Sequence, residues 1–388
     1  MKISAHTGAL RIALIQFLFF TTWVVYAIYL GDLLAGAGLD RSWLGVVLLM
    51  DQLIFAVMDP LLGAWADRIE THARRLAPFI VSLNLVASLA FAALPWASKT
   101  LPGLPMVFLG LTGLWVVTAS VLRAPLFVLL SRLEGPPALP FRLAYVLAAT
   151  ALGGALSPFL GLWLKGIDPL LPFLLSALTL ALAGLSLPGV PTSKAPAIRD
   201  RPLPDRRLPG LFLLTLLLAL GFQFHAFVAS GPLYRQFATA EALPWLFPTF
   251  WIGFNLGLYP TARLLQRDGP APWLIRLPVL GAMAFLLCLK APTLPLLLAG
   301  QVFLGICWGG FFMAGLQLAG QWGQSGLALG AWFSMLSLAG AGRLGLDKFL
   351  GLAPLTLETL GAGLWATGFI LTWAFFQPTH PTRTGQDI

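Results

Sequence analysis

Three ionisable residues lie inside stretches of the chain that are otherwise apolar. Asp51 and Asp59 belong to an apolar run at 42–66, and Arg123 belongs to another at 104–130. A charge inside a bilayer is costly, so such residues by default mark a transport pathway or a coupling site. These three side chains are therefore the first candidates for chemistry.

Asp59 and Arg123 lie at matching depths in their runs. Asp59 is eight residues before Asp67, and Arg123 is nine residues before Arg132. At about 1.5 Å of rise per helical residue, both lie roughly 12–14 Å from the same end of their helices. We therefore hypothesise an ion pair, which is the least costly way to keep both charges out of lipid. Three outcomes stay open: a static brace between two helices, a pair that opens and closes with transport or protonation, or no contact.

Asp51 precedes Asp59 by eight residues, which places it on broadly the same side of a helix. It lies nearer the outer surface than Asp59. One interpretation is a pore-lining or proton-carrying acid, and the other is a solvated position near the outer mouth.

Further polar side chains interrupt other apolar runs. His225, in the segment GFQFHAFVASGP, could carry a proton near neutral pH or could be a neutral, hydrogen-bonded residue. The amides of Asn255, Gln301 and Gln317 could bond to a solute or link one helix to another. The complete set of candidates for substrate binding or coupling is Asp51, Asp59, Arg123, Gln223, His225, Asn255, Gln301 and Gln317.

The elements that must hold these residues are membrane helices. The 388 residues are 58% hydrophobic and only 10% charged, whereas soluble domains carry roughly 25% charged residues. Open strands cannot cross lipid, and the runs are continuous rather than alternating, so a barrel is excluded. The expected fold is therefore all-α and integral to the membrane, with twelve transmembrane helices of about 20 apolar residues or more. The predicted runs are 10–34, 42–66, 77–97, 104–130, 142–165, 168–189, 209–232, 243–265, 272–290, 293–320, 326–348 and 354–377.

A polar, proline-rich segment divides the chain almost in half. We expect an N-terminal six-helix bundle at 1–190, a cytoplasmic linker at 191–208 and a pseudo-symmetric C-terminal bundle at 209–388. With the N-terminus inside, sixteen of the 24 lysines and arginines fall on the cytoplasmic side and seven on the other. This asymmetry predicts a multi-pass protein of the cell (inner or plasma) membrane with both termini cytoplasmic. The net charge of +9 is spread over short segments, so no nucleic-acid partner is expected.

A glycine-led basic turn follows the run at 42–66. It contains Gly63, Asp67 and Arg68, and then Arg74 and Arg75. A glycine, three residues, Asp-Arg and a basic cluster resemble the signature of the major facilitator superfamily. The resemblance implies a gate motif, in which the aspartate is suited to cap a neighbouring helix and the arginines to brace a cytoplasmic gate. It also implies two bundles that rock around a central cavity.

Within that superfamily the chain is most similar to the glycoside–pentoside–hexuronide:cation symporters. The similarity rests on the sequence DPLLG, which begins at Asp59, and on APLF, which begins at Ala124. In that family, acids on these two helices build a sodium site. Here only Asp59 is kept, while Phe55 and Arg123 stand where the other two acids are expected. An arginine would fill such a site with its own charge, so sodium coupling is not expected there.

The expected function is secondary active transport of a small organic solute by alternating access. Coupling is expected to protons rather than sodium, through Asp59, Asp51 or His225. One alternative is a transporter of the same fold that moves an amphiphile, such as a lysolipid, or a drug. An alternative of another class is a membrane receptor or scaffold that does not transport.

An enzyme is not expected, because the four histidines are scattered and no catalytic cluster gathers at one interface. The expected partners are the lipid bilayer, the solute and protons. No cofactor or metal is expected, and the protein is expected to be a monomer.

Overall fold

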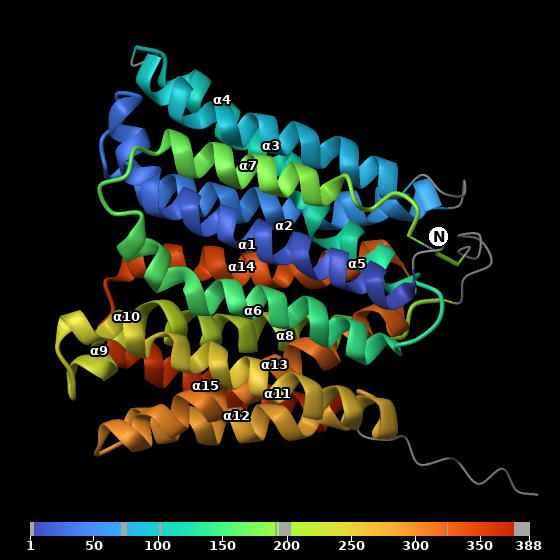
Figure 1. The fold of residues 1–388 in the computed structure, drawn as a ribbon. Coiled ribbons are helices and arrows are strands. Elements are labelled where there is room, and N and C mark those ends of the chain that lie inside the picture. Colours follow the sequence, from blue (N-terminus) through green and yellow to red (C-terminus); the bar gives the residue numbers. More distant parts are fainter. Residues whose placement is uncertain are drawn as a thin grey trace, which may run out of the picture.

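The computed structural model describes residues 4–70, 76–100, 103–190, 192–193, 203–323 and 325–375. Long helices lie side by side (Figure 1). With interrupted spans counted as one, the described helices form the two six-helix bundles of a twelve-helix fold. The N-terminal bundle contains α1 (Ala5–Gly36), α2 (Trp43–Glu70), α3 (Leu76–Thr100), α4 (Pro105–Ala119), η1 (Ser120–Leu122), α5 (Ala124–Ser131), α6 (Leu139–Trp163) and α7 (Leu170–Gly184). The C-terminal bundle contains α8 (Leu208–Phe224), η3 (His225–Ala229), α9 (Ser230–Arg235), η4 (Ala240–Ala242), α10 (Leu243–Leu246), α11 (Pro248–Asp268), α12 (Trp273–Lys290), α13 (Leu294–Gly323), α14 (Gly326–Leu350) and α15 (Pro354–Phe375).

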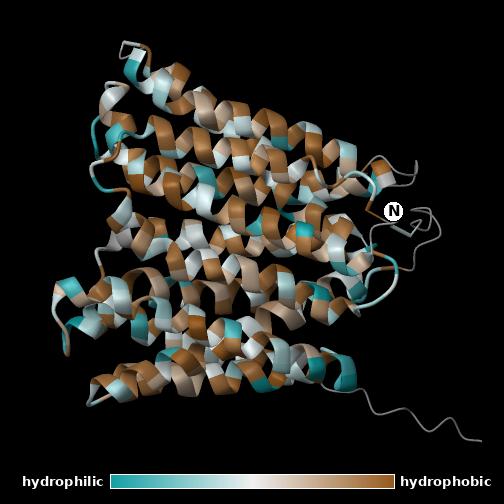
Figure 2. Cartoon of the chain, in the orientation of Figure 1, coloured by the Kyte–Doolittle hydropathy of each residue, from teal (hydrophilic) through white to brown (hydrophobic). Residues whose placement is uncertain are grey.

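Apolar residues predominate along these helices (Figure 2). Nine of the described spans are long and apolar enough to cross a membrane by length and composition alone. Large apolar side chains such as Leu89, Met106 and Trp163 are exposed on the outside. A helix satisfies its backbone hydrogen bonds internally, so lipid can cover such a surface without leaving polar groups unpaired.

Two ends of the molecule are distinguished below. The Asp67 end, at the right of Figure 1, contains the start of α1. The Asp168 end, at the left, contains the loop between α6 and α7. Exposed ion pairs occur at the Asp168 end, where Arg41 contacts Asp32 at 3.0 Å and Lys99 contacts Asp168.

The bundles meet along two helix pairs, α2 with α14 and α6 with α11. In α2, Pro60 has no N–H, so the carbonyl of Ala56 loses its usual helical donor. The hydroxyl of Ser334, on α14, donates to this carbonyl. A proline in one bundle therefore creates an acceptor for the other.

Small residues let α2 and α14 approach closely. A Cβ atom on Gly63 would collide with the backbone of Gly326, and one on Gly330 would collide with the backbone of Asp59. The glycine that leads the basic turn thus serves backbone contact between the bundles.

Among the predicted runs that are not continuous α-helix, two are broken beside a candidate functional residue. The run at 104–130 is broken by the 3₁₀ turn η1, which ends just before Arg123. Pro125 cannot donate to the carbonyl of Val121, so the helix restarts as α5. The run at 209–232 contains the π turn η3, which begins at His225. Pro232 cannot donate to the carbonyl of Val228, which disfavours a regular α turn there. Both interruptions coincide with a candidate functional residue.

Candidate functional site

Asp59 and Arg123 form the ion pair that their depths suggest. Arg123 Nη2 lies 3.1 Å from Asp59 Oδ2, and the carboxylate is fully buried. The same Nη2 donates to the carbonyl of Phe333 at 3.2 Å and to Ser337 Oγ at 2.8 Å, both on α14. The pair therefore also joins the two bundles, and the alternative that the charges do not meet is wrong.

Aromatic rings enclose the guanidinium group. Its carbon lies 4.5 Å from the centre of the Phe55 ring and 5.5 Å from that of Phe333. Such cation–π contacts gain strength where water is excluded. Phe55 and Arg123 therefore pack against each other next to the Asp59 carboxylate. Among the described residues, no group of three His, Cys, Asp or Glu side chains could hold a metal ion.

Backbone contacts position this arginine. Gln16 of α1 donates its amide N–H to the carbonyl of Leu122, at the end of the 3₁₀ turn. That carbonyl precedes Arg123 directly, so the contact holds the interrupted segment against α1. Arg123 is therefore positioned by the 3₁₀ turn that precedes it and by the contact of that turn with α1.

Asp51 lies in an aromatic pocket of the N-terminal bundle. It is 2% exposed and accepts a hydrogen bond of 2.9 Å from the hydroxyl of Tyr26. Rings of Trp23 and Trp115 pack on Tyr26. The alternative of a solvated position at the outer mouth is therefore wrong. Asp51 and Asp59 also have different neighbours, although they share one helix.

A second buried polar cluster lies inside the C-terminal bundle. His225 Nδ1 is 2.8 Å from Glu358 Oε1 on α15, and His225 Nε2 is 2.8 Å from Gln301 Oε1 on α13. All three side chains are buried, with at most 1% exposure. Rings of Phe250 and Phe285 flank the imidazole. The cluster contains an acid and a base that can share a proton away from water.

The sequence interpretation missed Glu358, and also missed Tyr26 and Ser337 as partners of candidate residues. Glu358 could have been found by the rule that singled out Asp59, because it is a lone acid in an apolar run. Tyr26 and Ser337 carry ordinary hydroxyl groups, which gave no such signal.

The other predicted residues have more local roles. Gln223 accepts a hydrogen bond of 3.1 Å from Arg343 Nε, and Asn255 donates to the carbonyl of Trp251 in its own helix. Gln317 lines a cavity, and its Oε1 has no hydrogen-bond partner among the described residues. The structure therefore brings only His225 and Gln301 of the predicted amide and imidazole groups together.

Asp67 of the gate motif caps a helix of the other bundle. Its carboxylate accepts hydrogen bonds from the backbone N–H groups of Gly326, at 2.8 Å, and Leu327, at 3.2 Å. These are unpaired donors at the start of α14, where a negative charge also stabilises the helix dipole. Arg74 and Arg75 lie outside the described residues.

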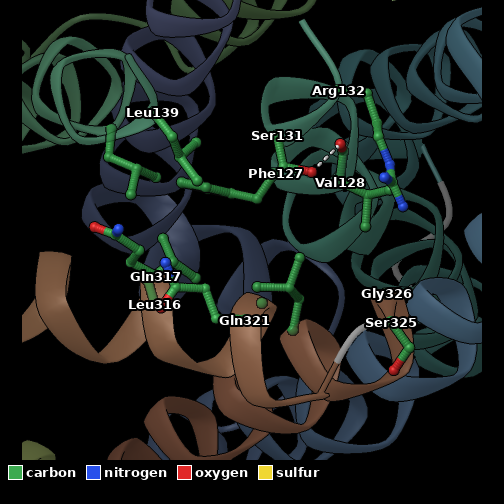
Figure 3. Close-up of a pocket in the computed structure, with 13 residues that line it drawn as sticks. Phe127, Val128, Ser131, Arg132, Leu139, Leu316, Gln317, Gln321, Ser325 and Gly326 are labelled. Carbon is green, nitrogen blue, oxygen red and sulfur yellow. Dashed lines mark hydrogen bonds between the residues drawn. The ribbon is translucent and has the colours of Figure 1, made fainter. Parts of the chain in front are cut away.

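Two cavities lie toward opposite ends of the bundles. Cavity A, of about 230 Å³, is at the Asp67 end between α5, α6, α13 and α14. Figure 3 shows its polar side chains, including Gln317, Gln321 and Arg132, together with Phe127. Cavity B, of about 610 Å³, lies toward the Asp168 end between α6, η3, α9, α10, α11 and α13. Cavity B contains Gln301, Ser157 and Ser230 in a wall that is otherwise largely apolar.

A chain of aromatic rings runs from one cavity to the other. It begins at Trp251, which lines cavity B, and ends at Phe127, which lines cavity A. Successive ring centres are 4.7–6.4 Å apart, which is normal for packed aromatic pairs. Both bundles contribute to this aromatic belt, whose members are Trp251, Phe254, Phe312, Trp332, Phe333 and Phe127.

Solved structures share this architecture. The human organic anion transporter MFSD10 (TETRAN) superposes with a TM-score of 0.74 at 18% identity, over 95% of this chain and 100% of that one. A proton:xylose symporter of the major facilitator superfamily, XylE, superposes with a TM-score of 0.73 at 12% identity, over 96% of each chain. The chain has the major facilitator fold.

A bacterial homologue of the iron transporter ferroportin shares the major facilitator fold as well. Its TM-score is 0.73 at 14% identity, over 95% of this chain and 99% of that one. Comparisons with protein-family models and with curated proteins give no match. These similar structures are an organic anion transporter, a homologue of an iron transporter and a proton:xylose symporter, so the fold leaves the solute open.

Proposed function

We propose that this protein is a secondary active transporter that moves a small organic solute by alternating access. The observation that carries the proposal is the pair of cavities at opposite ends, together with the aromatic belt from both bundles that runs between them. If residues 1–190 rock against residues 209–388, the aromatic rings of the belt would separate first toward one cavity and then toward the other. Only one side of the membrane would then have access at a time. The proposed setting is the cell membrane, with both termini cytoplasmic and the protein a monomer.

The proposed driving force is a proton gradient, coupled to movement of the solute. The buried His225–Glu358 pair and the buried Asp51 supply groups that can gain or lose a proton. Sodium coupling at Asp59 is disfavoured, because the Arg123 guanidinium already neutralises that carboxylate. We also propose that the chain is related to the glycoside–pentoside–hexuronide:cation symporters, with their cation site replaced by an internal ion pair.

The apolar wall of cavity B favours a second candidate function within transport. Phe227, Phe247, Phe250 and Trp251 surround its few polar groups. Such a wall suits an amphiphile or a hydrophobic drug better than a sugar, whose hydroxyl groups would lose their hydrogen bonds to water. Competition between hydrophilic solutes and lysolipids for uptake in vesicles separates the two candidates.

Alternating access is tested by labelling each cavity with a membrane-impermeant thiol reagent. The protein's own Cys288 and Cys307 are buried, so Ser157→Cys in cavity B and Gln321→Cys in cavity A provide defined targets. A transporter should show reciprocal changes: a proton gradient that raises labelling at one position should lower it at the other. Unchanged labelling at both positions under every gradient would exclude alternating access and favour a scaffold.

A further inference from the structure

Gln301 connects the buried His225–Glu358 pair with cavity B. Its Oε1 is bound to His225 Nε2. Its Nε2 has no hydrogen-bond partner among the described residues, although Gln301 is only 1% exposed and lines the cavity. A buried amide N–H₂ without a partner is costly, unless a ligand supplies the acceptor.

The orientation of Gln301 depends on the protons held by the pair. Because Gln301 Oε1 can only accept, His225 Nε2 must carry a hydrogen in this arrangement. A second hydrogen must lie between His225 Nδ1 and Glu358 Oε1, which are 2.8 Å apart. The pair therefore holds two protons in this state, written either as imidazolium with carboxylate or as neutral imidazole with carboxylic acid.

Loss of one proton to water reverses the amide. The remaining hydrogen is best placed on Nδ1, where it bonds to the Glu358 carboxylate. His225 Nε2 is then bare and can only accept. Rotation of the Gln301 amide by half a turn lets its N–H₂ donate to Nε2, and this rotation brings Oε1 to the cavity. The N–H bond at Nε2 is broken and its proton is transferred to solvent water; the other changes are confined to hydrogen bonds.

We propose that Gln301 converts the protonation of the His225–Glu358 pair into a change of hydrogen-bonding character at the wall of cavity B. With the proton bound, the cavity presents a donor and favours a solute oxygen that bears no hydrogen, such as a carbonyl or carboxylate. Without it, the cavity presents an acceptor. Solute and proton therefore bind together, which makes the protein a symporter for an acceptor-bearing solute. This inference rests on the proposed transport function and specifies how its coupling works.

Other charged and titratable groups near the pair do not take this role. Cys288 of α12 is close enough to interact with Glu358, but it does not line cavity B. Tyr234 of α9 lines the cavity and donates its hydroxyl to the carbonyl of Leu246. Arg343 of α14 reaches α8 and bonds to Gln223. On α11 and α12, the groups that flank the imidazole are the rings of Phe250 and Phe285.

The first test needs no ligand. In full-length protein labelled with ¹⁵N-histidine in lipid, solid-state NMR reports which ring nitrogens of His225 carry hydrogen, and His225→Gln assigns the signal. We expect Nε2 to lose its hydrogen as pH rises, while Nδ1 keeps one. Glu358→Gln should abolish this order of loss, whereas Cys288→Ala should retain it. If Nδ1 loses its hydrogen first, or Nε2 stays protonated over the whole stable pH range, the relay is excluded.

The second test uses two bicyclic probes of similar size, 1-indanone with an acceptor oxygen and indole with a donor N–H. Binding to the purified protein is followed by saturation-transfer NMR as pH changes. Indanone should bind about fivefold more tightly when the pair is protonated, and indole about fivefold more tightly when it is not. Parallel pH dependence of the two probes, or no binding by either, would overturn the proposal.

Two amides on α13 provide the matched variants. Gln301→Leu should remove the opposite pH dependence of the probes, because it deletes both the donor and the acceptor. Gln317→Leu changes an equivalent side chain in cavity A, away from His225, and should retain the opposite dependence. Retention in Gln301→Leu contradicts the relay. Opposite dependence in the wild type without solute flux in vesicles would leave the relay intact and reject the transport function instead.

Discussion

The two buried acid–base pairs of this protein differ in what their bases can do. Arg123 keeps its charge at any pH the protein experiences, so the guanidinium in contact with Asp59 does not exchange protons. The imidazole of His225 can gain or lose a proton, so its contact with Glu358 can exchange one. Similar geometry therefore serves two purposes: one pair is suited to hold helices together and the other to sense protons.

The pairs also differ in where they lie. Arg123 bonds across the seam between the bundles, to Phe333 and Ser337 of α14. His225 bonds within one bundle, and its partner Gln301 lines cavity B. A bundle that rocks must break the first set of contacts, whereas the second can move as part of a rigid body. We therefore expect substitutions at the seam, where α2 and α5 contact α14, to alter stability and conformation. Substitutions in the His225–Glu358–Gln301 cluster should instead alter the dependence on protons.

The largest effect is expected for Arg123→Gln. It leaves the Asp59 carboxylate buried without a compensating charge, which costs about 3–5 kcal/mol of stability. The thermal unfolding temperature in detergent and the rate of uptake in vesicles should both decline strongly. Asp59→Asn combined with Arg123→Gln should recover much of the loss, as for a static brace. If the double variant is stable but does not transport, the pair moves during the cycle instead.

Gly330→Ala sharpens the role of the seam itself. The added Cβ collides with the backbone of Asp59, so α2 and α14 must separate at a cost of about 1–3 kcal/mol. The thermal unfolding temperature should fall, and thiol labelling of Gln321→Cys in cavity A should rise. Gly345→Ala, on the same helix, is the matched control, because a Cβ there meets nothing within 4 Å. If both substitutions stabilised the protein equally, the gain in helix propensity would outweigh the collision, and close approach at Gly330 would not be required.

Asp67→Ala removes the cap that one bundle supplies to the other. Loss of the cap should cost about 1 kcal/mol and favour the state in which the Asp67 end is open. Thiol labelling of Gln321→Cys should therefore increase. Asp205→Ala is the control, because Asp205 accepts from the backbone N–H of Arg207 at the start of α8 within its own bundle. Increased labelling in that control as well would argue against a gate at Asp67.

The smallest effect is expected for Lys99→Gln at the Asp168 end. Its contact with Asp168 is exposed, and water and salt screen such pairs. The hydrogen bond from Lys99 lowers the pKa of Asp168, so any contribution to stability is present above the unfolded pKa and is lost as pH falls through the folded pKa. The thermal unfolding temperature of Lys99→Gln at neutral pH should equal that of the wild type within error. A clear loss there would show that this exposed ion pair contributes to stability after all.

The sequence supported the architecture and one contact because both follow from local properties. Apolar length predicts spans, and counting residues from the polar ends put Asp59 and Arg123 at one level. The same counting could not predict that Arg123 also reaches Ser337, because that requires the lateral order of helices from different bundles. Nor could it link His225 to Glu358, 133 residues away.

Composition and spacing by themselves determined that this chain is a helical membrane protein with charges that lipid would not tolerate unpaired. That outcome depends on hydrophobic length and on the cost of burying charge, which every segment carries alone. Only the tertiary structure decided which charge each acid meets and that Gln301 joins a proton site to a cavity. Those relations arise from packing among distant helices, and no single segment encodes the positions of its partners.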